Sequence, residues 1–247
     1  MTWNDLVALL GATAERLPFA EAAWIGGGAA FGRVDRWSDV DFQIACEAEH
    51  AEAAFAAIES VLPIELSVQG TGPLRQRFYR LRGEDPHLFV DFCVIPRSEL
   101  VPYLDPVRHG QPRVLFDRTG VLVPKRDPPS DLDVRLRRAV ARFRFFSRVM
   151  IERNIGRGKA VELAGAWTSF VLAPLVEVLR AVHDPERQDF GLRYTDIDLP
   201  SEVYATLVRI VSPSLANLAE AVALFDRAVD ELVRQERLPG DGRTRAW

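Results

Sequence analysis

The pattern of hydrophobic residues changes abruptly at a proline-rich segment near the middle of the chain, residues 123–130 (VPKRDPPS). Proline has a fixed φ and no backbone N–H, so such a cluster ends regular structure and is typical of a linker. Before the segment, short apolar runs alternate with turn residues; after it, apolar residues recur at helical spacing. The sequence therefore predicts an α/β (α+β) domain over residues 1–125 and an all-α helical bundle domain over residues 131–240.

Composition and charge narrow the class of protein. Of 247 residues, 48% are hydrophobic and 27% charged, which is an ordinary soluble composition. The net charge of −4 argues against a nucleic acid partner, because proteins that bind nucleic acid usually carry an excess of basic residues. The two cysteines fit a reducing compartment better than a disulfide scaffold. The N-terminus lacks the basic start of a secretory signal, and no apolar run is as long as a membrane span, so we expect a cytoplasmic protein without membrane contact.

The expected elements follow from local signals. Thr2 and Asp5 resemble a capping box at the start of a first helix. In the first domain we expect a second helix at Glu47–Val61 and strands at Asp39–Ala45, Ile64–Val68, Arg77–Leu81, Leu88–Ile95, Arg113–Phe116 and Val121–Val123, the last two as a hairpin. In the second we expect helices at Leu132–Asn154, Ala160–Val182 (kinked at Pro174), Glu202–Val211 and Leu215–Arg237.

Three consecutive glycines follow an apolar pair in the stretch Ile25–Ile44, IGGGAAFGRVDRWSDVDFQI. Glycines let the backbone approach a phosphate closely and turn its N–H groups inward, which makes an anion-binding nest. Gly26–Gly28 stand between a strand-like run and an expected helical turn, where such a nest fits. The signature is not that of a P-loop, and a tight turn without a ligand is the alternative.

Two aspartates one residue apart begin the next strand. Asp39 and Asp41 share one strand face, about 6.6 Å apart along the strand. When two carboxylates converge at a site partly shielded from water, one of them stays protonated unless a cation binds between them. Mg²⁺ prefers oxygen ligands of this kind. The alternatives are a strand face exposed to water, or a turn role for Asp39.

A third carboxylate lies inside a later apolar run. Asp91 is the only polar residue from Leu88 to Ile95, and a buried carboxylate is normally paired or bound to metal. If its strand neighbours that of Asp41, three acids would gather, which suits a two-metal site. The alternative is a salt bridge from Asp91 to Arg77 or Arg80.

These residues together resemble the DNA polymerase beta type nucleotidyltransferase superfamily. Gly27-Gly28 is followed after ten residues by Asp39-Val40-Asp41 and then by Asp91 on a later strand. The placement of Gly32 and Ser38 is most similar to the branch that adenylylates aminoglycoside and lincosamide antibiotics. The resemblance is strong over residues 24–95 and less specific to about residue 200. It implies a mixed-sheet nucleotidyltransferase core with a helical partner domain.

The resemblance also implies a reaction. Asp39, Asp41 and Asp91 would be catalytic and would hold two Mg²⁺ ions, with Asp91 as a candidate proton acceptor. A nucleoside monophosphate, AMP from ATP, would pass to a hydroxyl of a small molecule such as an aminoglycoside, with release of pyrophosphate. Two alternatives are a toxin-type enzyme that acts on tRNA or protein, and a catalytically silent nucleotide-binding regulator.

The resemblance extends to the residues that bind the nucleotide. Gly27 and Gly28 would hold its phosphates with Ser38, and Lys159 is a weaker candidate for the same role. One position departs from the pattern, because Gly28 stands where the family usually has serine, so the backbone must make that contact alone.

Weaker signals come from the helical half. Glu177 is a candidate general base, or a partner of Arg180 by i, i+3 spacing. Five acids between residues 184 and 198 could attract a cationic antibiotic, although a solvated loop is the simpler interpretation: Asp184, Glu186, Asp189, Asp196 and Asp198. The arginines of the helix from Leu132 predict a solvated, salt-bridged face, with one or two able to reach a triphosphate.

Overall fold

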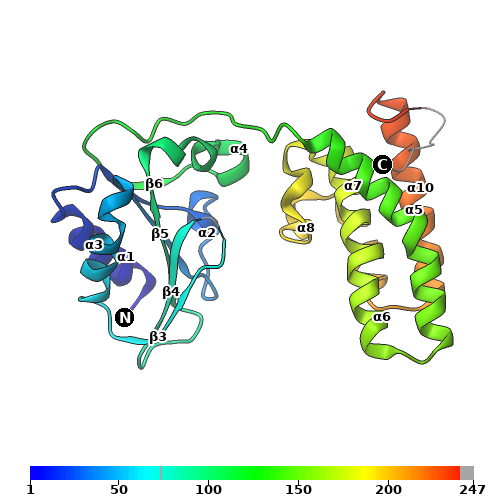
Figure 1. The fold of residues 1–247 in the computed structure, drawn as a ribbon, viewed down its shortest axis with the longest axis horizontal. Helices are drawn as coiled ribbons and strands as arrows, with labels where there is room; N and C mark the ends of the chain where they lie inside the picture. Colours follow the sequence, from blue (N-terminus) through cyan, green and yellow to red (C-terminus); the bar gives the residue numbers. More distant parts are fainter. Residues whose placement is uncertain (73, 240–247) are drawn as a thin grey trace. The chain divides into compact units, whose positions relative to one another are not determined.

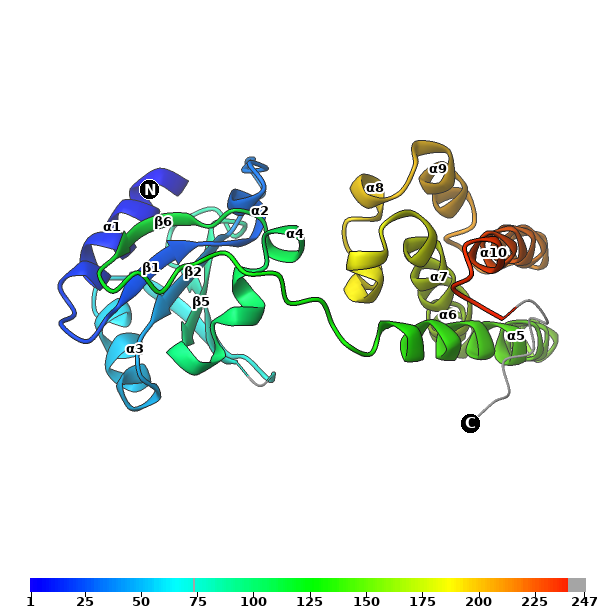
Figure 2. The ribbon, with the colours of Figure 1, turned by 90° about the horizontal axis from the view of Figure 1, so that it is seen from above.

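The chain folds into two compact units in the computed structural model, which describes residues 1–72 and 74–239. The first unit is Met1–Pro128 and the second begins at Pro129. The first contains a six-stranded sheet with helices, and the second is built of helices (Figures 1 and 2). The fold class predicted from the sequence is therefore confirmed. The predicted end of the helical domain, residue 240, lies outside the described residues.

The sheet of the first unit is mixed, with strand order β3-β4-β5-β2-β1-β6. Strands β2 and β5 run parallel, and the other neighbouring pairs run antiparallel. The strands are β1 (Ala22–Ile25), β2 (Val40–Ala45), β3 (Ile64–Gln69), β4 (Arg75–Leu81), β5 (Phe89–Ile95) and β6 (Arg113–Asp117). A parallel pair needs a crossover between its strands, and here α3 (Ala51–Glu59), β3 and β4 lie between β2 and β5 in the sequence.

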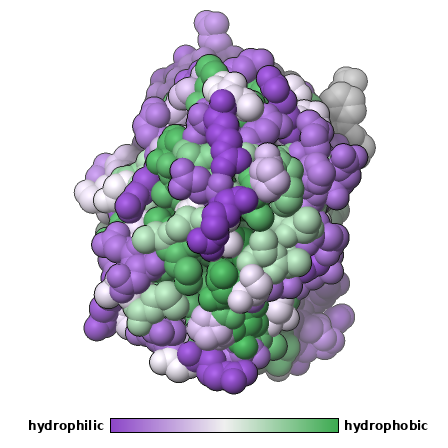
Figure 3. Space-filling view, turned by 90° about the vertical axis from the view of Figure 1, so that its left-hand side faces the viewer, coloured by the Kyte–Doolittle hydropathy of each residue, from purple (hydrophilic) through white to green (hydrophobic). Residues whose placement is uncertain are grey.

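Helices α1 (Trp3–Glu15) and α3 (Ala51–Glu59) cover one face of the sheet (Figure 1). The predicted capping box at the start of α1 is present: Asp5 N–H donates to the Thr2 hydroxyl, and the Asp5 side chain accepts from Thr2 N–H. Buried side chains of both helices pack with Phe42 of β2 and Phe92 of β5 in one core. On the outer surface of this side, hydrophilic side chains are interspersed with apolar ones (Figure 3).

Strand alternation decides which side chains face away from α1 and α3. Val40, Phe42 and Ile44 belong to the core beneath the helices. Asp41 and Gln43, at the intervening positions of β2, therefore point to the opposite face. A smaller apolar core, which includes Trp24 and Cys93, lies on that face with residues after β5. The short helices α2 (Gly27–Ala30) and α4 (Pro106–His109) belong to this unit as well.

The predicted hairpin after β6 does not form. Residues Val121–Val123 are not a strand, and β6 pairs with β1 instead. The Asp117 carboxylate accepts hydrogen bonds from Val121 N–H (3.1 Å) and Leu122 N–H (3.0 Å), so these groups are bonded to a side chain rather than to a strand partner. The prediction of a strand at Val121–Val123 was wrong because a side chain can cap the same backbone groups.

The start of the proline-rich segment is fastened to the first unit. Lys125 N–H donates to the Leu104 carbonyl at 3.1 Å. The fully buried Asp105 carboxylate accepts from Asp127 N–H at 2.8 Å and forms an ion pair with Arg126 at 3.2 Å. These contacts explain why the first unit continues to Pro128.

The second unit contains six α-helices among its described residues: α5 (Leu132–Gly156), α6 (Ala160–Trp167), α7 (Ala173–His183), α8 (Thr195–Asp198), α9 (Ser201–Arg209) and α10 (Leu215–Arg234). Their buried faces form one core, in which the Phe143 and Phe225 rings stack with centroids 3.9 Å apart. The Trp167 indole N–H donates to the Ile210 carbonyl at 3.2 Å. The unit is therefore held together by apolar packing, and buried side-chain hydrogen bonds such as this one join its helices.

The predicted helix Ala160–Val182 forms, with an irregular middle. A π-helical segment, Thr168–Leu172, joins α6 to α7 just before Pro174. Proline cannot donate the i to i−4 hydrogen bond, and a π-bulge is one way for a helix to absorb that loss. The whole segment Ala160–His183 is long and apolar enough to cross a membrane by length and composition, so the expectation that no run has that length was wrong. Many of its side chains, such as Trp167 and Leu175, lie in the core of the unit.

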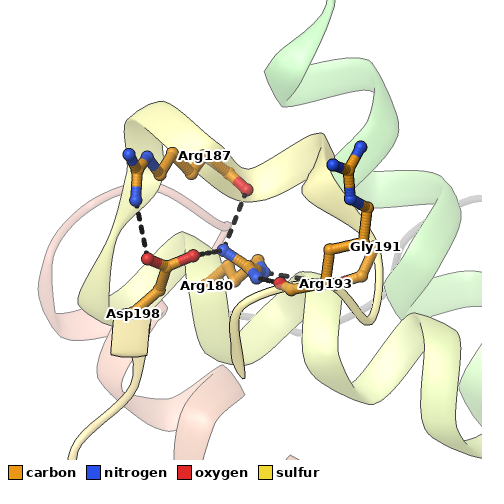
Figure 4. Close-up of polar contacts among 5 residues, drawn as sticks. All are labelled: Arg180, Arg187, Gly191, Arg193 and Asp198. Atoms are coloured by element: carbon orange, nitrogen blue, oxygen red, sulfur yellow. Dashed lines mark hydrogen bonds and ion pairs between the residues drawn. The ribbon is translucent and has the colours of Figure 1, made fainter. Parts of the chain in front are cut away.

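A buried cluster of charges orders the segment after α7, as Figure 4 shows. Arg180 is fully buried and forms an ion pair with Asp198, which also binds Arg187 Nη1 at 2.7 Å. The Arg180 guanidinium further donates to the carbonyls of Arg187, Gly191 and Arg193. Asp198 is thus not part of a solvated loop, and Arg180 bonds to Asp198 rather than to Glu177. The solvated-loop interpretation was wrong for Asp198, and the pairing of Glu177 with Arg180 was wrong, because the fold brings residues 180 and 198 together.

Candidate active site

Asp41 and Asp91 occupy the same register position of the parallel strands β2 and β5. Neighbouring strands lie about 4.8 Å apart, and residues paired in register point to the same face of a sheet. The two side chains therefore stand next to each other on the face opposite α1 and α3. The sequence predicts that Asp41 and Asp91 come together only if their strands are neighbours in the sheet, and β2 and β5 are neighbours.

Asp91 is oriented by Gln76, a residue that no local pattern in the sequence singles out. Gln76 Nε2 of β4 donates to Asp91 Oδ1 at 2.6 Å, and Cys93 Sγ lies 3.7 Å from the same oxygen. Burial raises the pKa of the Cys93 thiol, and the charges of Asp91 and Asp41 raise it further, so the thiol stays protonated as a donor. The amide and the thiol hold the carboxylate in place on the sheet surface.

The arginines proposed as alternative partners of Asp91 bind other acids. Arg77 pairs with Glu52 at 2.7 Å and Glu59 at 2.9 Å. Arg80 pairs with Glu65 at 3.2 Å, at the edge strand β3. Their guanidinium groups are thereby engaged on neighbouring elements.

The glycine turn packs directly on Asp41. Gly26 N–H donates to the Asp41 carbonyl at 2.9 Å, which ties the turn to β2. Gly27 has φ 51°, and a Cβ at this position would lie 1.7 Å from Asp41 Oδ2. Only glycine fits there, because any side chain would displace the carboxylate and strain the backbone. The structure thus sets a bare stretch of backbone against one of the two carboxylates.

Gln43 adds an acceptor on the same face, two residues after Asp41. Among the described residues its Oε1 atom is buried and has no hydrogen-bond partner. This atom lies beneath the turn, 3.0 Å from the position that a Cβ on Gly26 would take. A buried polar atom without a partner costs roughly 1–3 kcal/mol, and a bound ligand could relieve that cost. Strand alternation could have identified Gln43 from the sequence, since it shares the face of Asp41.

Asp39 and Ser38 precede β2. The Asp39 carbonyl accepts from the Trp3 indole N–H at 2.8 Å, so α1 holds this residue in place. The Ser38 hydroxyl donates to Asp35 Oδ1 at 3.0 Å and accepts from Asp35 N–H at 2.9 Å. Ser38 is therefore part of a turn, and a phosphate contact by its hydroxyl stays a prediction.

The donor set fits a hard divalent cation that takes some of its ligands from a substrate. Within the parts of the chain that the structure describes, no group of three or more His, Cys, Asp or Glu side chains could hold a metal ion by itself. Mg²⁺ is commonly bound by one or two carboxylates, with water and substrate phosphates completing the shell. Asp41 and Asp91 meet that requirement, and binding of a second ion with Asp39 stays a prediction.

The remaining candidate residues belong to the second unit. Lys159 precedes α6, and its ammonium group binds Glu162 at 2.8 Å. Glu177 lies on α7, and its Oε1 atom is buried without a hydrogen-bond partner among the described residues. The relation of both residues to the carboxylates of the first unit stays a prediction.

Comparison with known proteins finds distant matches among solved structures. No family model and no curated protein matches the chain. A nucleotidyltransferase-like protein from Exiguobacterium sibiricum 255-15 is 11% identical with a TM-score of 0.38, over 93% of this chain and 75% of that one. The Thermotoga maritima CCA-adding enzyme, in complex with tRNA, is 15% identical with a TM-score of 0.34, over 94% of this chain and 69% of that one. TM-scores at this level carry no inference about function.

Proposed function

We propose that the protein is a Mg²⁺-dependent nucleotidyltransferase. In the proposed reaction it moves AMP from ATP to a hydroxyl group of a small molecule and releases pyrophosphate. The observation that supports this most directly is the register of Asp41 and Asp91, with the bare backbone of Gly27 packed against Asp41. The order of glycines and acids in the sequence, which resembles the polymerase beta type superfamily, supports the same activity.

Each residue of the site has a role in this proposal. Asp41 and Asp91, with Asp39, would hold Mg²⁺, which offsets the negative charge that builds up on the phosphates during transfer. The N–H groups of Gly27 and Gly28 would bind the phosphates that leave as pyrophosphate. Asp91, fixed by the Gln76 amide, would accept the proton of the attacking hydroxyl. Most of the rate enhancement would then come from positioning and charge stabilisation.

The identity of the acceptor is the finer part of the proposal. An aminoglycoside-like antibiotic, which offers several hydroxyl groups, is the acceptor that the sequence resemblance favours, and the enzyme would then confer antibiotic resistance. We place the reaction in the cytoplasm, where ATP is available. The two cysteines, both free and buried, are compatible with a reducing compartment.

A labelling experiment tests the activity and the acceptor together. The full chain is incubated with Mg²⁺ and each α-labelled nucleoside triphosphate, separately with aminoglycosides, lincosamides, a metabolite extract, tRNA and total protein. Label from ATP on a small molecule supports the proposal, and Asp41→Asn should remove that label. Label on tRNA or protein would indicate the toxin-type alternative instead. Tight binding of ATP with no labelled product in any pool would indicate a silent nucleotide-binding regulator and contradict the proposal.

A further inference from the structure

A cavity of about 300 Å³ lies within the second unit, between α5 and a wall formed by α7 and the π-helical segment before it. This volume is at the lower end of the range for small-molecule sites. Its walls are lined mainly by charged side chains of α5 and by small residues of the facing helix: Asp131, Arg135, Arg138, Ala139, Arg142, Ser169, Ala173, Pro174 and Glu177.

Helix geometry explains the hollow. Arg135, Arg138 and Arg142 are spaced i, i+3, i+7 and so share one face of α5. On the opposite wall, Ser169, Ala173 and Glu177 recur every four residues and also share a face. The two small side chains leave space that larger ones would fill, and Glu177 closes one end of it. The cavity is thus a consequence of residue size and spacing on two packed helices.

The charge balance of the cavity favours an anion. Arg135 binds the Asp131 carboxylate at 2.9 Å, so that pair is neutralised. No acidic side chain among the described residues forms an ion pair with Arg138 or Arg142. The Arg142 guanidinium instead lies over the Phe170 ring, 5.1 Å from its centroid, which restricts its orientation. Two guanidinium groups one turn apart therefore face the cavity with their hydrogen-bonding capacity available.

Glu177 places a second requirement on the ligand of the cavity. Its Oε1 atom is shielded from solvent and has no hydrogen-bond partner within the described residues. Burial raises the pKa of Glu177, although the nearby Gln188 amide and Arg135 act to lower it. A carboxylate in this position accepts a hydrogen bond from any donor that enters the cavity. A ligand that fits both ends therefore carries an anionic group and, a few ångströms away, a hydroxyl.

We infer that this cavity is a binding site for a small phosphomonoester that also bears a hydroxyl group. The phosphate would lie between Arg138 and Arg142, and the hydroxyl would donate to Glu177. A phosphomonoester carries close to two negative charges and three acceptor oxygens, which matches two guanidinium groups better than a single carboxylate does. The inference concerns the second unit alone and does not depend on the transfer reaction.

Calorimetric titration of the full chain, without divalent cations, tests the inference. The probes are glycerol 3-phosphate, inorganic phosphate and glycerol, with spermidine as a cationic control. Saturable binding of glycerol 3-phosphate, weaker binding of inorganic phosphate, and none of glycerol or spermidine are expected. The double variant Arg138→Gln/Arg142→Gln should weaken phosphomonoester binding about tenfold or more, because it removes two charge-assisted contacts.

Matched variants separate this site from others. Arg148→Gln removes an exposed arginine of the same helix that pairs with Glu152, and should leave binding unchanged. Glu177→Gln should reduce the preference for glycerol 3-phosphate over inorganic phosphate, a ratio that mere loss of stability would not change. The Asp41→Asn variant should bind glycerol 3-phosphate as the unaltered chain does. Binding at the cavity can therefore be tested independently of the proposed transfer reaction. Absence of saturable phosphate binding, or binding that the double variant leaves intact, would overturn the inference.

Discussion

Asp41 and Asp91 are paired residue for residue across the parallel strands β2 and β5. Residues 42–90 lie between them in the sequence, and they meet because β5 joins the sheet beside β2 with no register shift between the strands. Two carboxylates held this close repel each other unless a cation or a proton lies between them. The pair is therefore the feature on which the proposed chemistry rests.

We expect Asp41→Asn and Asp91→Asn to lower the rate of nucleotidyl transfer by about 100-fold or more, because each removes charge from the proposed cation site. Because asparagine keeps the shape of the side chain, the thermal unfolding midpoint should not fall. Initial rates with labelled ATP and circular dichroism measure the two effects. Glu49→Gln, at an exposed acid of the same unit, is the control and should retain full activity. Activity that survives both aspartate substitutions would remove these residues from the mechanism.

The two glycines of the turn should respond differently to alanine. Gly27→Ala places a methyl group on the Asp41 carboxylate and imposes left-handed backbone on an L-residue, at roughly 1–2 kcal/mol for the backbone alone. Gly28→Ala meets its nearest atom, the Arg33 carbonyl oxygen, at 3.4 Å, which is an ordinary contact. We expect Gly27→Ala to lose both activity and stability and Gly28→Ala to keep most of each. Equal effects of the two substitutions, measured by transfer rate and thermal unfolding, would contradict the described geometry.

The space at Gly28 also allows a test of its proposed role in binding the nucleotide phosphates. Gly28→Ser introduces the hydroxyl that the superfamily resembled by this sequence usually carries, in a position that accepts a Cβ. A hydroxyl there can donate one further hydrogen bond to a nucleotide phosphate. We expect a lower KM for ATP with little change in kcat, with Gly28→Ala as the matched variant without the hydroxyl. A higher KM for Gly28→Ser than for Gly28→Ala would show that this residue does not face the phosphates.

The buried cluster around Arg180 should contribute more to the stability of the second unit than an exposed ion pair does. Arg180→Met leaves the Asp198 carboxylate buried with one of its two arginine partners lost and should cost roughly 3–5 kcal/mol. Hydrogen exchange of the α7 amides in the full chain reports this loss. Arg234→Met, which breaks the exposed pair with Glu231, is the control and should change little. Similar exchange rates in the two variants would show that the cluster contributes no more than a surface ion pair.

Acid should release the contacts around Asp105. Burial acts to raise the pKa of this carboxyl, but hydrogen bonds from Asp127 and Val107 N–H and the Arg126 charge outweigh it and lower the pKa. A carboxyl with a lowered folded-state pKa stabilises the protein above the unfolded value, about 3.9. That stabilisation is lost as the pH falls through this value toward the folded-state pKa.

The stability difference between the unaltered chain and Asp105→Asn should therefore be largest near neutral pH and shrink below about pH 4. Urea midpoints and exchange of the Val107 and Asp127 amides, measured from pH 7 to pH 3, follow it. Asp127→Asn keeps the backbone N–H that binds Asp105, so it should show the pH response of the unaltered chain. A difference that stays constant with pH would mean that the Asp105 charge makes no contribution.

Features that depend on neighbouring residues could be predicted from the sequence. The capping box at Thr2, the strands around Asp41 and Asp91, the long helix from Leu132 and the change of fold at the proline-rich segment all follow from propensity and periodicity within a few residues. The requirement for glycine at Gly27 belongs to the same group, since a glycine run directly after a strand already indicates unusual backbone. These signals are local because they arise from φ, ψ and side-chain spacing.

Tertiary structure alone decided which of these elements meet. The register that pairs Asp41 with Asp91, the Gln76 amide that holds Asp91, and the choice of Asp198 over Glu177 as the partner of Arg180 depend on contacts between residues far apart in the chain. Local spacing cannot rank such partners, because a charge binds whichever group the packed core brings within reach and shields from water. The sequence determined the elements and their reactive side chains, and the packing of the sheet and helices determined the pairs they form.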